Sequence, residues 1–167
     1  MSVHINAPVR THERRPAIVW AFAVVLVFLG LSAVGGGLAM LSGAAPPDSW
    51  LDNIPVVTSW TIPGLVLGLV FGAGSLVTAY GVIRRPSWVW LSGVERLTGQ
   101  HWSWVAGVLL GVGQVVWIGL ELAYLPETSF LQVLYGSTGL ILVLLPMLPA
   151  VRRSLSRPES HHPYIGR

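Results

Sequence analysis

The sequence predicts an all-α membrane protein: a bundle of four transmembrane helices with its N and C termini in the cytoplasm. Of its 167 residues, 53% are hydrophobic and only 10% are charged, whereas about a quarter of the residues in an average soluble domain are charged. Four apolar runs are long enough to cross a hydrocarbon core of about 30 Å, which takes roughly 20 helical residues. The arginines cluster beside these runs, and there is no lysine.

Backbone polar groups in lipid must be paired within the segment that carries them, so each apolar run is expected to be a helix. The connections between the runs are short, and the chain reads as a single membrane domain over residues 1–167. The predicted helices cover residues 17–41, 62–83, 103–125 and 130–148.

The arginines predict the orientation, because Lys and Arg close to helix ends favour the cytoplasmic side. The tails, residues 1–16 and 149–167, and the loop between the second and third helices contain all ten arginines. The other two loops contain none and carry Asp48, Asp52 and Glu127. Both tails are therefore predicted to be cytoplasmic.

The first helix has an alternative interpretation as a cleaved secretory signal, because small residues at Gly43 and Ala45 follow a basic start and an apolar run. Its apolar stretch of 25 residues, 17–41, is longer than the roughly 7 to 15 residues of a signal core. This length favours a retained helix, and the rest of the topology is the same in both cases.

Two connecting segments carry tryptophans, which favour the headgroup layer and are expected to be anchors there. Residues 84–102 mix apolar and charged residues and predict a short interfacial helix, with a partner-binding loop as the alternative. Residues 42–60 are rich in proline, which rules out a long helix there, and predict a lid on the outer surface. Asp48 and Asp52 in this lid are expected to be solvated carboxylates, with a cation site as the alternative.

Glycines mark the helix faces that are expected to pack closely. In the second helix Gly64, Gly68 and Gly72 recur every four residues, and in the third helix Gly107 and Gly111 do the same. Small residues let helix backbones approach in lipid, where there is no hydrophobic drive for association. These two faces are predicted to be packing faces, with the second helix central to the bundle.

The third helix continues its glycine face with two polar residues, Gln114 and Glu121. Glu121 lies four residues before Leu125, about 6 Å below the outer end of the helix. The short turn to the fourth helix brings Gln132 to a similar depth, with Tyr135 one turn deeper. Because a buried polar group without a partner is costly, we expect Glu121 to be hydrogen-bonded to Gln132, Tyr135 or the outer loop.

The cluster of Gln114, Glu121, Gln132 and Tyr135 is therefore the candidate site. It has three interpretations: a structural polar clamp, a proton or ligand site at Glu121, or a glutamate that reaches the outer surface. Membrane enzymes are disfavoured, because the chain has no cysteine and its histidines, four of them in the tails and His101 beside the third helix, lie outside the spans. No metal, cofactor or nucleic-acid partner is predicted.

Several short motifs resemble a family of uncharacterised, small, four-helix integral membrane proteins of actinobacterial type. They are SWTIPGLVLGLVFGAG, RRPSWVW, HWSWVAGVLLGVGQVVWIGLE and FLQVLYGSTGL, within residues 58–153. The resemblance implies a polar residue at the position of Gln114 and a Leu-Gln pair opening the fourth helix. Proline often follows that glutamine in the family, whereas this chain has Val133. The family has no known activity to carry over.

Two functional hypotheses follow. The first is an accessory or interaction protein of the bacterial cytoplasmic membrane, without catalysis, which contacts a membrane-protein partner or a second copy through its glycine faces and outer loop. The second is a small transporter or ligand-binding protein that uses the polar cluster around Glu121 in an outward-facing cavity.

Overall fold

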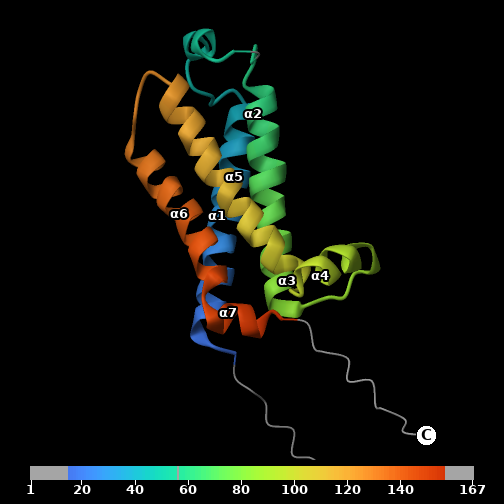
Figure 1. Cartoon of the computed structure of the whole chain (residues 1–167). Coiled ribbons are helices and arrows are strands. Elements are labelled where there is room, and N and C mark those ends of the chain that lie inside the picture. Colours follow the sequence, from blue (N-terminus) through green and yellow to red (C-terminus); the bar gives the residue numbers. More distant parts are fainter. Residues whose placement is uncertain (1–14, 56, 157–167) are drawn as a thin grey trace, which may run out of the picture.

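The computed structural model describes residues 15–55 and 57–156, and its long helices run up and down in a bundle (Figure 1). The predicted spans are confirmed as helices within one residue at each end, and by length and composition all four can cross a membrane. They are α1 (Ala17–Leu41), the continuous helix made of α2 (Thr61–Leu65), η2 (Val66–Ala73) and α3 (Gly74–Arg84), α5 (Trp102–Tyr124), and α6 (Phe130–Met147).

The shorter elements lie at the two ends of the bundle (Figure 1). One end, here called the acidic end, holds η1 (Asp48–Asn53) and the turn between α5 and α6. The opposite end, the arginine end, holds η3 (Val89–Leu91), α4 (Ser92–Thr98) and α7 (Pro149–Ser154). The described arginines lie at this end, close to helix ends, whereas Asp48 and Asp52 lie at the acidic end.

Two prolines, Pro146 and Pro149, lie at the point where the fourth span ends. Pro146 is buried in the last turn of α6, which ends at Met147, while Pro149 occupies the first turn of α7. Proline is well suited to a first turn because its missing N–H would have no intrahelical partner there. The chain thus turns into a new helix instead of leaving the bundle.

The second span contains a π-helical segment, η2, which the sequence did not predict. It packs against the C-terminal half of α1, where Gly72 approaches Val34 and Leu67 approaches Gly36, and Phe71 within it is buried. Wide turns of this kind are rare inside α-helices, and those that occur are often found at functional sites. Two of its residues, Val66 and Leu67, line the cavity described below.

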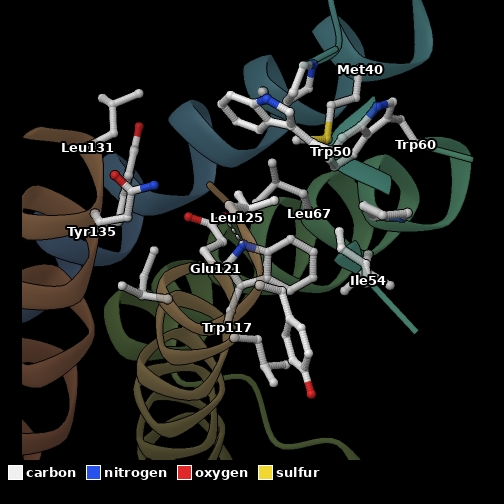
Figure 2. Close-up of a pocket in the computed structure, with 18 of the residues that line it drawn as sticks. Met40, Trp50, Ile54, Trp60, Leu67, Trp117, Glu121, Leu125, Leu131 and Tyr135 are labelled. Carbon is white, nitrogen blue, oxygen red and sulfur yellow. Dashed lines mark hydrogen bonds between the residues drawn. The ribbon is translucent and has the colours of Figure 1, made fainter. Parts of the chain in front are cut away.

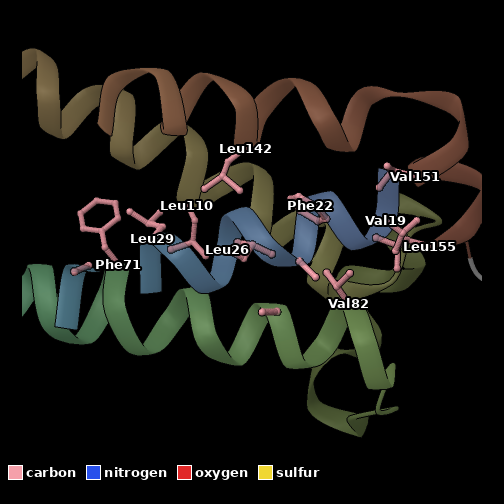
Figure 3. Close-up of a cluster of buried hydrophobic side chains, with 13 residues drawn as sticks. Val19, Phe22, Leu26, Leu29, Phe71, Val82, Leu110, Leu142, Val151 and Leu155 are labelled. Atoms are coloured by element: carbon pink, nitrogen blue, oxygen red, sulfur yellow. The ribbon is translucent and has the colours of Figure 1, made fainter. Parts of the chain in front are cut away.

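The apolar core is built around α1, which runs between α3 and α6 (Figure 3). Phe22, Leu26 and Leu29 of α1 are buried there, together with Val82 of α3 and Leu142 of α6. The second span was expected to be central, but the most apolar windows of α1 and of the second span are equally buried, 39% in each. The centre of the bundle is therefore the contact between these two helices.

Glycines make that contact close. A Cβ atom placed on Gly37 of α1 would lie 2.6 Å from the Gly64 carbonyl oxygen and 2.7 Å from the Gly68 amide nitrogen. On Gly72 it would lie 2.7 Å from the Val34 side chain. These distances are too short for any side chain, so the predicted glycine face of the second span is a packing face, and its partner is α1 of the same chain.

The glycine face of α5 is also used inside the chain. A Cβ atom on Gly107 would meet the Phe22 ring at 2.4 Å, and one on Gly111 would meet the Gly139 carbonyl oxygen at 2.9 Å. Both predicted faces are thus covered by neighbouring helices. They offer no free glycine surface for the contact with a partner that the first functional hypothesis required.

The arginine end is closed by hydrogen bonds between segments. Glu95 of α4 accepts a hydrogen bond from the Trp102 backbone N–H at the start of α5 (3.3 Å), and the Trp102 indole donates to the Pro86 carbonyl (3.2 Å). The Arg15 guanidinium donates to the carbonyl oxygens of Val82 and Ile83, which end α3. A carboxylate at a helix start and a cation at a helix end both suit the helix dipole.

His101 caps α5 as a neutral imidazole. Its Nδ1 accepts from the Ser103 backbone N–H at 3.3 Å and lies 2.8 Å from the Ser103 hydroxyl, while Nε2 faces the Pro86 carbonyl at 3.3 Å. Burial lowers the pKa of His101, and Arg85 lowers it further, against the opposing effects of the Pro86 carbonyl and Glu95. Nδ1 can accept these hydrogen bonds only while it carries no proton.

The tryptophans differ in how far they are buried, and their predicted role as anchors in the headgroup layer stays a prediction. Trp20 and Trp90 are exposed, but Trp60 and Trp102 are buried and the other four are half-buried. A buried indole N–H needs a hydrogen-bond acceptor. The half-buried Trp104 has one, since its indole donates to the Pro146 carbonyl at 2.8 Å. The segment 84–102 forms η3 and α4 with Val89, Trp90 and Leu97 exposed, and its place at the membrane interface stays a prediction.

Candidate functional site

The acidic end of the bundle contains a cavity of about 750 Å³. It is lined by α1, the start of the second span, the halves of α5 and α6 at this end, and the loop around η1 (Figure 2). All four residues of the predicted polar cluster line it, namely Gln114, Glu121, Gln132 and Tyr135. The remaining lining is mostly aliphatic and aromatic, so the cavity is an apolar space with a few polar groups.

Glu121 points into this cavity from α5 (Figure 2). Its Oε1 accepts a hydrogen bond of 2.6 Å from the Trp117 indole. The predicted partners, Gln132, Tyr135 and the outer loop, were therefore wrong. Trp117 precedes Glu121 by four residues, and side chains at this spacing lie on one face of a helix, so the carboxyl group finds a donor without leaving its own helix.

Trp117 is itself held in place by the second span. Its ring packs edge-on against Phe71 of the π-helical segment, with ring centroids 5.8 Å apart and planes at 65°. Edge-to-face contacts of this kind are favourable beyond the area that they bury. The contact links η2 to the orientation of Glu121 through a single intervening side chain.

Gln132 is used locally, at the start of α6. Its side-chain oxygen lies 2.6 Å from the Ser129 backbone nitrogen and 2.8 Å from the Ser129 hydroxyl, while that hydroxyl accepts from the Leu131 N–H at 3.2 Å. This is a capping box, in which the two side chains satisfy backbone donors at a helix start. Gln132 therefore has its partners and does not pair with Glu121.

Tyr135 lies against α1. Its ring stacks on Phe28, with centroids 6.2 Å apart and planes at 20°. Figure 2 shows it across the cavity from Trp60, with Glu121 between them. Tyr135 thus forms one wall of the cavity and is not a clamp for the glutamate.

Gln114 is the deepest polar group of the cavity. It lies two turns below Glu121 on α5, about 10 Å along the helix axis, and it is only 2% exposed. Its side-chain oxygen has no hydrogen-bond partner among the described residues. Such a group normally costs about 1–3 kcal/mol, so an unpartnered amide on a cavity wall suggests a partner that is not part of this chain.

The predicted lid covers the cavity. Trp50 and Ile54 in and after η1, Val57, and Trp60 before α2 contribute to its lining. Trp60 is 8% exposed, and its indole N–H has no partner among the described residues. The sequence predicted the loop's position on the outer surface but not that Trp50 and Trp60 turn inward to the cavity.

Sequence reasoning missed Trp117, Trp60 and Phe71 as parts of the site. For Trp117 a signal was available, since a tryptophan four residues before an intramembrane glutamate can donate to it along the helix. Trp60 and Phe71 carried no such signal, because their roles depend on how the lid and the second span sit against α5.

The site contains hydrogen-bonding groups and apolar walls, an arrangement suited to holding a small molecule. Comparison of the chain with protein-family models, with curated proteins and with solved structures gave no match.

Proposed function

We propose that this protein is a multi-pass membrane protein that binds a small amphipathic molecule in the cavity at its acidic end. The observation that carries the proposal is the coincidence of an apolar cavity with a buried, unpartnered amide, Gln114, and an oriented carboxyl group, Glu121. This corresponds to the second hypothesis from the sequence, in its ligand-binding form.

The size and lining of the cavity support binding of a small molecule. Ligand sites are typically about 300–1,000 Å³, mostly apolar, with a few polar groups that fix orientation. The volume of about 750 Å³ lies within this range. Its polar groups sit at two depths on α5, at Gln114 and at Glu121, so an occupant with polar groups along an apolar body satisfies both.

The charge asymmetry supports a location. Because arginine-rich ends favour the cytoplasm, we infer that the acidic end and its cavity face the outer side of the bacterial cytoplasmic membrane. The chain contains no cysteine, so single cysteines at Ser49 and Ser92 report cleanly on topology. An impermeant thiol reagent is expected to label Ser49→Cys and not Ser92→Cys in intact cells, and the reverse pattern would place the cavity on the cytoplasmic side.

Photolabelling tests the binding itself. The purified protein in phosphatidylcholine nanodiscs is irradiated with a neutral long-chain alcohol that carries a diazirine, and the labelled residues are mapped by mass spectrometry. We expect saturable labelling around Glu121 that unlabelled alcohol competes away. Labelling that never saturates and is confined to lipid-facing positions such as Leu109 and Leu144 would reject the proposal.

Two glycines of α1 provide matched variants for this experiment. Gly36 lines the cavity, where a Cβ atom would lie 3.0 Å from the Leu67 side chain, while a Cβ atom at Gly35 meets no described residue within 4 Å. We expect Gly36→Phe to abolish the saturable labelling by filling the cavity and Gly35→Phe to leave it unchanged. If both variants label like the original protein, the alcohol binds elsewhere.

The competing hypothesis is an accessory protein that contacts a membrane-protein partner or a second copy of the chain. Its glycine faces are occupied within the chain, so such a contact would need the exposed apolar surfaces. Co-purification of a stoichiometric partner from native membrane, together with the absence of saturable labelling, would favour this hypothesis over ligand binding.

A further inference from the structure

The charges around the cavity are of one sign. Among the described residues that line it there are two carboxyl groups, Glu121 and Glu127, and neither arginine nor histidine. Asp48 and Asp52 lie in η1 at the same end, whereas the described arginines belong to the opposite end. A cleft with low-dielectric walls and charges of one sign concentrates ligands of the opposite sign.

The walls of the cavity are rich in aromatic rings. Trp50, Trp60, Trp117, Tyr124 and Tyr135 all contribute to its lining, and Figure 2 shows several of these rings around the Glu121 carboxyl group. The faces of aromatic rings attract organic cations, and cages of such rings recognise quaternary ammonium groups. A bulky, apolar cation thus meets favourable surface on several sides.

Glu121 is held in position as a counter-charge. The Trp117 indole donates to Oε1, while no hydrogen bond to Oε2 is formed within the described residues. The carboxyl group therefore has acceptor capacity left over on the side of the cavity. Trp117 is braced by Phe71, so the group is oriented before any ligand arrives.

Gln114 adds an acceptor at the bottom of the cavity. Its amide oxygen Oε1 is buried and has no partner among the described residues, so it can accept an N–H group or face a positive charge. The Trp60 indole N–H is a buried donor without a partner in the same described lining. Because the only charged side chains among the described lining residues are the two carboxyl groups, the cavity does not favour an anionic ligand.

We propose that the cavity binds lipophilic organic cations, with Glu121 as the counter-charge, the aromatic walls around the cationic centre and Gln114 as a deep acceptor. This inference rests on the proposed function, since it names the chemical class of the ligand for the same cavity. Neutral amphiphiles fit the walls but leave the Glu121 charge without a partner.

Two ions of equal shape and opposite charge test the inference: tetraphenylphosphonium and tetraphenylborate. Each competes with the photoreactive alcohol for the protein in phosphatidylcholine nanodiscs, and its affinity is calculated from its measured concentration in the lipid. We expect the cation to bind at least tenfold more tightly than the anion. Equal binding of the two ions, or tighter binding of the anion, would overturn the inference.

Variants assign the preference to a residue. Glu121→Gln removes the charge but keeps an acceptor for the Trp117 indole. Asp52→Asn is the control, because Asp52 lies at the same end of the bundle but does not line the cavity. We expect Glu121→Gln to abolish the preference for the cation and Asp52→Asn to preserve it. A preference that survives Glu121→Gln, in a variant that elutes as the original protein does, would also overturn the inference.

The experiment separates the two proposals. If the alcohol labels saturably but the cation shows no advantage, the cavity binds small molecules and the ligand class is wrong. If the alcohol does not label saturably, the proposed function itself fails, whatever the charge of the ligand.

Discussion

The two ends of the bundle are made by the same four helices, but they differ in the size of the cavity that the helices leave and in the hydrogen bonds between segments. At the arginine end, Leu155 and Val82 are buried, and Trp102 and His101 have hydrogen-bond partners in other segments. A smaller pocket of about 340 Å³ lies at this end too, and two buried atoms there, Arg85 Nε and Gln100 Oε1, have no partner among the described residues. At the acidic end the helices leave a cavity of about 750 Å³, and the Gln114 side-chain oxygen on its wall has no partner among the described residues.

The difference lies in the size of the space and in the contacts between segments, and not in whether every polar group has a partner. Tight packing is what a folded interior normally shows. Proteins depart from this rule mainly at functional sites, where the cost is offset elsewhere. The arginine end, with its hydrogen bonds between segments, is therefore expected to contribute more to stability, and the acidic end with its larger cavity is expected to be the binding end.

Truncating a side chain at each end tests this contrast most strongly. Leu155→Ala removes a side chain that is 1% exposed, and such changes cost about 2–5 kcal/mol because the core cannot collapse around the gap. Leu67→Ala only enlarges an existing cavity, so a much smaller loss is expected. Chemical unfolding of both variants measures the difference, and equal losses would contradict the contrast.

The glycine contact beneath the cavity gives the next largest effect. Gly37→Ala forces a methyl group against the backbone of Gly64 and Gly68, and overpacking of this kind costs about 1–3 kcal/mol. Gly35→Ala on the same helix meets nothing within 4 Å and is expected to be neutral or to stabilise by up to about 1 kcal/mol through helix propensity. Thermal unfolding of the pair checks this, and equal midpoints would show that the close contact is not required.

Gln114→Leu sharpens the comparison by making the acidic end resemble an ordinary core. Removing a buried polar group without a partner is expected to raise the free energy of unfolding by about 1–3 kcal/mol and at the same time to weaken ligand binding. Denaturant unfolding and photolabelling of the same preparation measure both effects. A destabilised Gln114→Leu protein would support the structural clamp that the sequence also allowed.

Acidification is expected to loosen the arginine end, and its effect on stability is expected to be the smallest of the four predictions in this comparison. Burial lowers the pKa of His101 below its ordinary value of 6.5, so the unfolded loop binds a proton more readily than the folded one. The contribution of His101 is therefore complete above about pH 6.5 and is lost as the pH falls from there through the lower folded pKa. The stability of the cavity end is expected not to follow this titration.

Hydrogen exchange of residues 84–102 between pH 8 and pH 5 measures this loosening. The matched variant is His101→Asn, which retains a capping side chain and does not titrate. The pH dependence should disappear in this variant. If it persists, another group controls the loop.

The sequence by itself determined the four helices, the charge asymmetry of the two ends and the faces that carry glycine. These features are local: the length and hydropathy of a run decide whether it can form a spanning helix, and the spacing of residues decides which of them share a face. Gly64, Gly68 and Gly111 could thus be assigned to packing faces without a structure.

Only the tertiary structure decided that Trp60 turns inward, that Phe71 packs against Trp117, that η2 is a π-helix and that a cavity is left at one end. Each of these depends on how far the helices are rotated and displaced relative to one another. The hydropathy of a single run does not encode that placement, since every face of a spanning helix is apolar. The packing of α1 against the second span sets it, and with it the space that remains beside Glu121.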